Sequence, residues 1–133
     1  MYQILIPVDR NQERAEAQAD YLLNCPVDPD EIEVTVLHVL TREDASTADA
    51  ESFDGNEAAI ELANRIEGAG ISVDRRLATG EPVAERILDR AAELDADQIV
   101  MSGRNRSGVS QVLIGSTTQD VMHNTERPVV MVG

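Results

Sequence analysis

Short apolar segments rich in β-branched residues alternate with helical segments along the whole chain, and this alternation most constrains its fold. Strands are expected at 3–8, 32–40, 71–80, 96–103 and 127–133, and helices at 11–24, 56–70, 81–95 and 116–125. Strands that alternate with helices form a parallel sheet with helices on both faces. Since 133 residues are the size of one domain, we predict a single doubly wound α/β domain over 1–133.

Glycine and proline mark the predicted ends of these elements. Gly68 and Gly70 end the second helix. Pro82 stands in the first turn of the third helix, where proline is tolerated. The acidic segment 41–55 has no periodicity and is predicted to be a mobile loop.

The net charge of the chain excludes some classes of binding partner. The chain has 25 acidic residues and 11 basic ones, all of them arginine, and its formal net charge is -14. Nucleic-acid binding needs basic patches and stacking aromatics, which this sequence lacks, so no nucleic-acid partner is expected. Abundant acids without lysine fit a cytoplasm rich in salt, where self-repulsion is screened. We therefore hypothesise a halophilic host.

Membrane and metal sites find little support in the sequence. No segment has the roughly 18 consecutive apolar residues of a membrane span, and the first residues resemble a strand, so a cytoplasmic location is expected. Cys25, His38 and His123 lack metal-ligand spacing. We expect Cys25 to be a partly buried apolar residue, His38 a hydrogen-bonded structural residue, and His123 a partner of its helix's C-terminal dipole.

Candidate binding residues follow the predicted strands, because open parallel sheets bind ligands beyond the carboxyl ends of their strands. The candidates are Pro7 to Asp9, Val39, residues 79–81 and the segment from Ser102 onward. The last is SGRNRSGVSQVLIGS, which has two arginines and no acid. It leads into a helix whose first residues, 115–117, would offer free N–H groups to an anion.

Several motifs can be excluded in this segment. Its G-x4-G spacing places Val109 where a phosphate-binding P-loop needs lysine. Ser110 lacks the second glycine of a hydrolase nucleophile elbow. No G-x-G-x-x-G follows the first strand, so a nicotinamide cofactor is not expected.

Four stretches give the chain a resemblance to the universal stress protein (UspA) family over essentially its whole length: ILIPVD, VLHV, RSGVSQVLIGS and GSTTQDVMHNTERPVVMV. The ATP-binding branch of that family carries G-x2-G-x9-G-[S/T]. Here Ser102 and Asn105 replace the first two glycines, while the spacer 106–114 and Gly115-Ser116 are intact. Asn105 can adopt the left-handed backbone conformation that glycine would supply, but its side chain is expected to narrow the phosphate site. Arg104 and Arg106 either offer charge to phosphate or pair with acids in a solvated loop.

The resemblance implies a fold, a ligand and a site. The fold is adenine nucleotide alpha hydrolase-like, with strand order 3-2-1-4-5 and a pocket between strands one and four. The implied ligand is ATP or another adenine nucleotide, with or without Mg²⁺. Asp9 would hydrogen-bond the adenosine end of the ligand, and Val39 would contact the base. Residues 102–105 and 115–117 would surround the ribose and the phosphates. The expected site residues are Pro7, Val8, Asp9, Val39, Met101, Ser102, Gly103, Arg104, Asn105, Gly115, Ser116 and Thr117.

The last strand, 128–132, is apolar, and in the family it pairs with its counterpart in a second subunit, so a homodimer is expected. The favoured function is a nucleotide-binding stress or signalling protein. Two alternatives stay open: a dimeric interaction module without ATP, and an enzyme with slow ATP hydrolysis or autophosphorylation. No convincing general base or pair of metal-binding carboxylates supports the enzyme.

Overall fold

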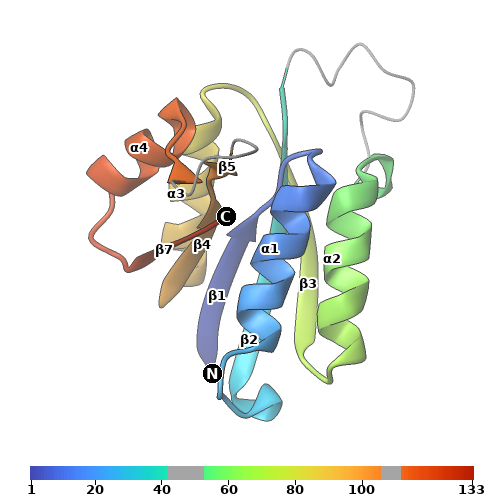
Figure 1. Ribbon diagram of the computed structural model, residues 1–133. Helices are drawn as coiled ribbons and strands as arrows, with labels where there is room; N and C mark the ends of the chain where they lie inside the picture. The colour runs from blue at the N-terminus through green and yellow to red at the C-terminus, as the bar shows by residue number, and fades with distance from the viewer. Residues whose placement is uncertain (42–52, 106–111) are drawn as a thin grey trace.

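The computed structural model describes residues 1–41, 53–105 and 112–133, which form a five-stranded parallel sheet (Figure 1). In chain order its strands are β1 (Tyr2–Pro7), β2 (Ile32–Leu40), β3 (Ser72–Thr79), β4 (Gln98–Ser102) and β7 (Val129–Val132). They lie in the order β3-β2-β1-β4-β7, and every adjacent pair is parallel. The predicted doubly wound sheet and the order 3-2-1-4-5 are therefore confirmed.

Two pairs of helices cover the two faces of the sheet (Figure 1). The first pair is α1 (Gln12–Leu23) and α2 (Glu57–Gly68), and the second is α3 (Val83–Leu94) and α4 (Ser116–His123). Short 3-10 turns occur at Pro29–Glu31 and Phe53–Gly55.

Each pair of helices encloses its own aliphatic core. Because successive side chains of a strand point to opposite faces, Ile4 and Ile6 of β1 lie in the core under α1 and α2, whereas Leu5 lies in the core under α3 and α4. The same alternation places Val36 and Leu37 of β2 in different cores. The three central strands, β1, β2 and β4, are buried on both faces, as parallel strands commonly are, whereas the edge strands β3 and β7 are partly exposed.

Several boundaries differ from the sequence-based expectation. Pro82 is the N-cap of α3 and not part of its first turn, because the residue has extended backbone angles (φ -75°, ψ 147°). The segment predicted as a loop after β4 contains a short antiparallel pair, β5 (Arg104–Asn105) with β6 (Val112–Leu113). Of the predicted mobile loop 41–55, residues 42–52 lie outside the described residues.

The single-residue expectations are mostly met. His38 is 2 % exposed and hydrogen-bonded, as predicted. Cys25 is a partly buried free thiol. His123 lies in the last turn of α4. Within the described residues, no helix is both long and apolar enough to cross a membrane.

Candidate functional site

The sheet opens at the carboxyl ends of β1 and β4. These strands pair only at Ile4 with Gln98 and at Leu5 with Ile99, whereas β1 continues beside β2 as far as Pro7. β1 and β4 therefore separate beyond Leu5, at the point where the chain order of the sheet reverses. This is the position at which open α/β sheets form ligand sites.

A buried glutamine closes the floor of this opening. Gln18 of α1 is 1 % exposed, and its Nε2 donates to the carbonyl of Pro7 at 2.7 Å and to that of Val100 at 3.0 Å. Where two strands part, their backbone carbonyls lose ladder partners, and a buried carbonyl without a partner is costly. Gln18 satisfies one carbonyl from each strand and so stabilises the separation.

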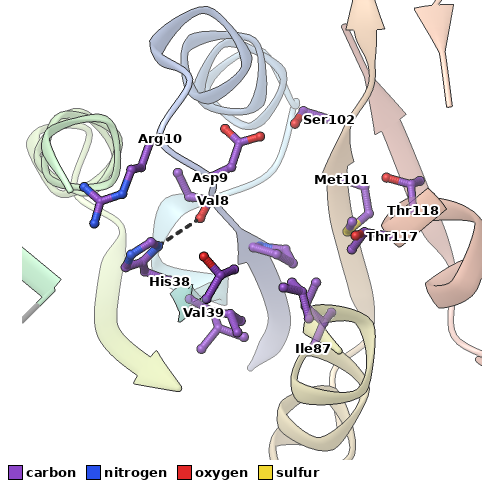
Figure 2. A pocket seen from close by; sticks show the side chains of 14 residues that line it. Val8, Asp9, Arg10, His38, Val39, Ile87, Met101, Ser102, Thr117 and Thr118 are labelled. Atoms are coloured by element: carbon purple, nitrogen blue, oxygen red, sulfur yellow. Dashed lines mark hydrogen bonds between the residues drawn. The ribbon is translucent and has the colours of Figure 1, made fainter. Parts of the chain in front are cut away.

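Two adjoining hollows lie above this floor. The larger one has a volume of about 330 Å³, and Figure 2 shows the side chains that face it from β1, β2, α3, β4 and α4. The smaller one, of about 140 Å³, lies between α1 and the start of α4. Four residues line both hollows: Asp9, Ser102, Thr117 and Thr118.

The larger hollow has mainly aliphatic walls with polar groups at its mouth. Its aliphatic residues are Val8, Leu37, Val39, Val83, Ile87 and Met101. Asp9, Arg10, His38 and Thr41 supply polar groups. An apolar pocket with a few convergent polar groups is the usual form of a small-molecule site, with the polar groups fixing the orientation of the ligand.

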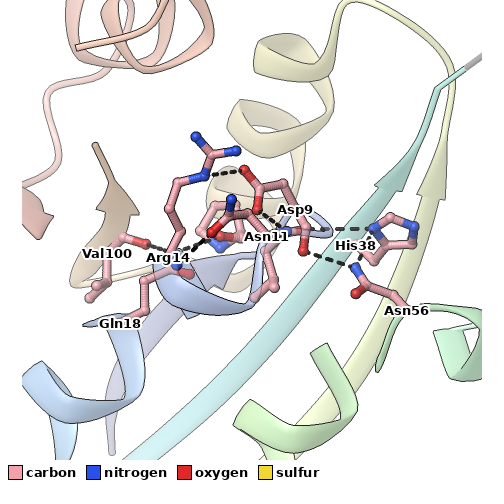
Figure 3. Close-up of polar contacts among 9 residues, drawn as sticks. Asp9, Asn11, Arg14, Gln18, His38, Asn56 and Val100 are labelled. Carbon is pink, nitrogen blue, oxygen red and sulfur yellow. Dashed lines mark hydrogen bonds and ion pairs between the residues drawn. The ribbon is translucent and has the colours of Figure 1, made fainter. Parts of the chain in front are cut away.

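Asp9 is held in place by three neighbours (Figure 3). Its Oδ1 accepts a hydrogen bond from the Asn11 N–H at 2.8 Å, and its Oδ2 lies 2.9 Å from the Nε of Arg14. Its backbone carbonyl accepts from Nδ2 of Asn56 at 3.1 Å. The carboxylate is half exposed, so it is fixed in direction yet open to a ligand.

Asn56 and His38 form a buried polar pair behind Asp9. Asn56 is the N-cap of α2: its Oδ1 accepts from the Ala59 N–H at 3.2 Å, which fixes the orientation of the amide. Its Nδ2 lies 3.1 Å from Nδ1 of His38, which is also 3.5 Å from the carbonyl of Val8. This pair ties α2 to the backbone that carries Asp9.

The smaller hollow is lined by hydroxyls and by the first turn of α4. Gly115 is the N-cap without a side-chain cap bond, so N–H groups of the first turn face the hollow without an intrahelical acceptor. Ser102, Ser116, Thr117 and Thr118 contribute their side chains. Thr118 is 5 % exposed, and its hydroxyl has no hydrogen-bond partner among the described residues.

The structure brings most of the predicted site residues together. Seven line the larger hollow: Pro7, Val8, Asp9, Val39, Met101, Ser102 and Thr117. Gly115 and Ser116 line the smaller one. Gly103 lines neither, because it is buried and its N–H donates to the carbonyl of Val132 at 2.7 Å.

The other candidates follow β4 or lie at the end of β3. Arg104 and Asn105 form β5, Arg106 lies outside the described residues, and residues 79–81 line neither hollow. Sequence reasoning missed a further set that does line the hollows: Arg10, Arg14, Leu37, His38, Thr41, Val83, Ile87 and Thr118. Position next to a predicted strand end was a usable signal for His38 and Thr41, whereas no sequence signal distinguished Arg14 from other helix arginines.

An open parallel α/β sheet with a two-part hollow at its switch point is the arrangement in which doubly wound proteins form ligand sites. The model of the universal stress protein family matches residues 1–133, and the chain belongs to this family.

Individual relatives agree with this assignment. Universal stress protein MJ0531 of Methanocaldococcus jannaschii is 30% identical over 79 residues, which are 59% of this chain and 46% of that protein. The universal stress protein of Archaeoglobus fulgidus has a solved structure with a TM-score of 0.72 and 25% identity, covering 100% of this chain and 99% of that one. A structure of the universal stress protein from A. fulgidus in complex with dAMP has a TM-score of 0.73 and 24% identity, over 100% of this chain and 98% of that one.

Proposed function

We propose that this universal stress protein binds an adenine nucleotide at the carboxyl end of β1 and acts in the cytoplasm, as a homodimer, in stress response or signalling. The observation that carries the proposal is the pair of adjoining hollows, one mainly apolar and one polar, that share Asp9. A nucleotide has the same division, with a flat base and ribose at one end and phosphate at the other.

The larger hollow suits the adenosine end. Val39 and Ile87 offer apolar surface to the base, and the Asp9 carboxylate can accept hydrogen bonds from ribose hydroxyls. The dAMP complex of the A. fulgidus protein supports an adenine ligand, as does a second universal stress protein whose structure contains cAMP.

The smaller hollow suits phosphate. The N–H groups that open α4 favour an anion, and the buried Thr118 hydroxyl offers a further hydrogen bond. The dipole contributes only about 0.3–1 kcal/mol at an exposed site, so neighbouring groups must add to it. Ser102 replaces a glycine of the ATP-binding motif and lines both hollows, so we propose that its hydroxyl faces the ribose or the first phosphate.

We propose a binding protein without a dedicated catalytic centre. Among the described residues that line the two hollows Asp9 is the single acid, and within the same part of the chain no three His, Cys, Asp or Glu side chains cluster as a metal site. Any Mg²⁺ would therefore arrive with the phosphates of the nucleotide. Slow hydrolysis of bound ATP is the enzymatic alternative.

Calorimetry with adenosine, AMP and ATP, with and without Mg²⁺ and in molar salt, tests the proposal. Val39→Phe should fill the larger hollow and abolish binding. Val27→Phe makes the same change at an exposed position beside a different hollow and should bind like the wild type. Absence of binding by the wild type, or wild-type binding by Val39→Phe, would refute the site and favour the dimeric interaction module without nucleotide.

A further inference from the structure

An arginine that the glycine motif does not include lies at the polar end of the site. Arg14 is in the first turn of α1, and its backbone N–H donates to Oδ1 of the helix cap, Asn11, at 3.0 Å. Its side chain is 26% exposed and lines the smaller hollow, opposite Ser116 and Thr117 of α4. Of the described residues that line this hollow, Arg14 is the one with a positive charge.

The guanidinium has nitrogen atoms to spare. Its Nε lies 2.9 Å from Oδ2 of Asp9, the ion pair drawn in Figure 3. Neither terminal nitrogen has a partner among the described residues. Asp9 is itself fixed through its other oxygen by the Asn11 N–H, so the arginine is held before any ligand arrives.

Asp9 alone would repel a phosphate from this hollow. Two negative charges a few ångströms apart disfavour each other unless a cation lies between them. The ion pair with Arg14 cancels the charge of Asp9, and the free terminal N–H groups can donate to phosphate oxygens as guanidinium groups commonly do.

The Thr118 side chain adds a further polar group to this hollow. Thr118 is 5 % exposed, lines both hollows and has no hydrogen-bond partner within the described chain. The hydroxyl can therefore donate to or accept from a ligand group in the hollow.

We propose that Arg14 is the residue that selects phosphorylated ligands: it makes this protein prefer adenine nucleotides to adenosine, while Asp9 positions it. This inference rests on the proposed function and adds the origin of the preference for phosphate. It assigns the phosphate contact to α1, whereas the sequence motif directs attention to the arginines that follow β4.

The test compares dissociation constants for AMP and adenosine, measured by calorimetry on the whole protein. The wild type should bind AMP more tightly than adenosine. Arg14→Gln should weaken AMP binding by about 10- to 100-fold, as expected for a lost hydrogen bond to a charged group. The affinity for adenosine should change by less than about two-fold, because adenosine lacks the phosphate. Arg14→Lys should retain part of the preference for AMP, because lysine keeps the positive charge. It should not retain all of it, because lysine lacks the planar set of guanidinium N–H donors.

Arg65→Gln is the matched control. Arg65 forms a similar ion pair between neighbouring helices, 2.7 Å from Asp20, but does not line either hollow. It should leave both affinities unchanged. Unchanged preference for AMP in Arg14→Gln would overturn the inference and leave the proposed function standing. An equal loss of both ligands would overturn it too, since that indicates a structural role. A wild type that binds neither ligand would refute both proposals.

Discussion

At the scale of single residues, the site depends on a carboxylate that is fixed on three sides. Asn11, Arg14 and Asn56 hold the two oxygens and the backbone carbonyl of Asp9. None of these contacts blocks the exposed half of the carboxylate. In the proposed site such preorganisation would lower the entropy cost of binding, because the Asp9 carboxylate would already be in its ligand-binding position.

A second single-residue feature, at the opposite end of the sheet, gives a pH prediction. Tyr21 is partly buried beside Cys25 and Gln98, and its OH accepts a hydrogen bond from Gln98 Nε2 at 3.3 Å. Burial, and then the hydrogen bond with Cys25, raise the pKa of Tyr21 above its ordinary value of 10.0. In Tyr2→Phe, where Tyr21 is the sole tyrosine, we expect the phenolate absorbance to titrate above 10.0 in the folded protein.

The sign of the effect on stability follows from this direction. The unfolded chain releases the Tyr21 proton near 10.0 and the folded chain at higher pH. The folded state therefore binds more protons between these values, and stability falls as pH rises through that window. Tyr21→Phe should remove the part of the stability loss at alkaline pH that comes from the ionisation of Tyr21. A Tyr21 midpoint at or below 10.0 would contradict the burial argument.

At the scale of secondary-structure elements, α1 stabilises the separation of β1 and β4 beneath the candidate site. Its buried side faces the sheet with Ala15, Ala19 and Leu22, which bring the helix close, and with Gln18, which bridges β1 and β4. The separation of two strands thus depends on a side chain from a helix that packs across both of them.

We therefore predict that Gln18→Leu destabilises the fold although it keeps nearly the same volume. Two buried carbonyls, those of Pro7 and Val100, would lose their donor. Each unsatisfied group costs about 1–3 kcal/mol. Urea denaturation measures the loss of free energy of unfolding.

The control is the same substitution on the exposed side of α1. Gln12→Leu should change the free energy of unfolding by no more than about 0.5 kcal/mol. Equal stability of Gln18→Leu and Gln12→Leu would mean that the bridge between the strands contributes nothing.

At the scale of the whole molecule, β7 is an edge strand whose outer side is uncovered by the described part of the chain. The carbonyls of Pro128 and Val132 bond β4, so alternate residues, 129 and 131, direct their backbone groups outward. An unpaired apolar edge is a template for pairing with another chain. This geometry supports the proposed homodimer.

The dimer prediction can be tested at one outward residue. The wild type should scatter light as a particle of twice 14.5 kDa in high salt. Met131→Pro removes one outward N–H without breaking a bond to β4, because proline is tolerated at a strand edge, and should yield monomers. Met131→Thr keeps the N–H and should remain dimeric. A wild-type monomer would refute this assembly.

Net charge predicts a dependence of stability on salt. A charge of -14 repels itself in the compact state, and molar salt shortens the Debye length to about 3 Å. The melting temperature should therefore rise between low and molar KCl, as the hypothesis of a halophilic host requires. The variant Glu16→Gln with Glu61→Gln, at exposed positions of α1 and α2, should show a smaller rise. A melting temperature independent of salt would count against the hypothesis.

Local pattern predicted the elements well. The five parallel strands and the four helices follow from periodicity, which each segment carries in its own residues. The position of the candidate site was predicted from the rule that open parallel sheets bind ligands at the carboxyl ends of their strands. The strand order followed from the resemblance to a family. The errors lie at boundaries such as Pro82 and at the β5–β6 pair, where neighbouring structure decides the backbone.

The sequence by itself thus determined the alternation of strands and helices and placed Asp9 directly after the first strand. Only the tertiary structure decided which other residues surround Asp9 in the candidate site: Arg14 beside it, Gln18 beneath it, and Asn56 with His38 behind it. The physical reason is distance along the chain. Periodicity is a property of neighbouring residues, whereas these contacts join segments up to 82 positions apart, and only packing of the helices on the sheet sets which side chains meet.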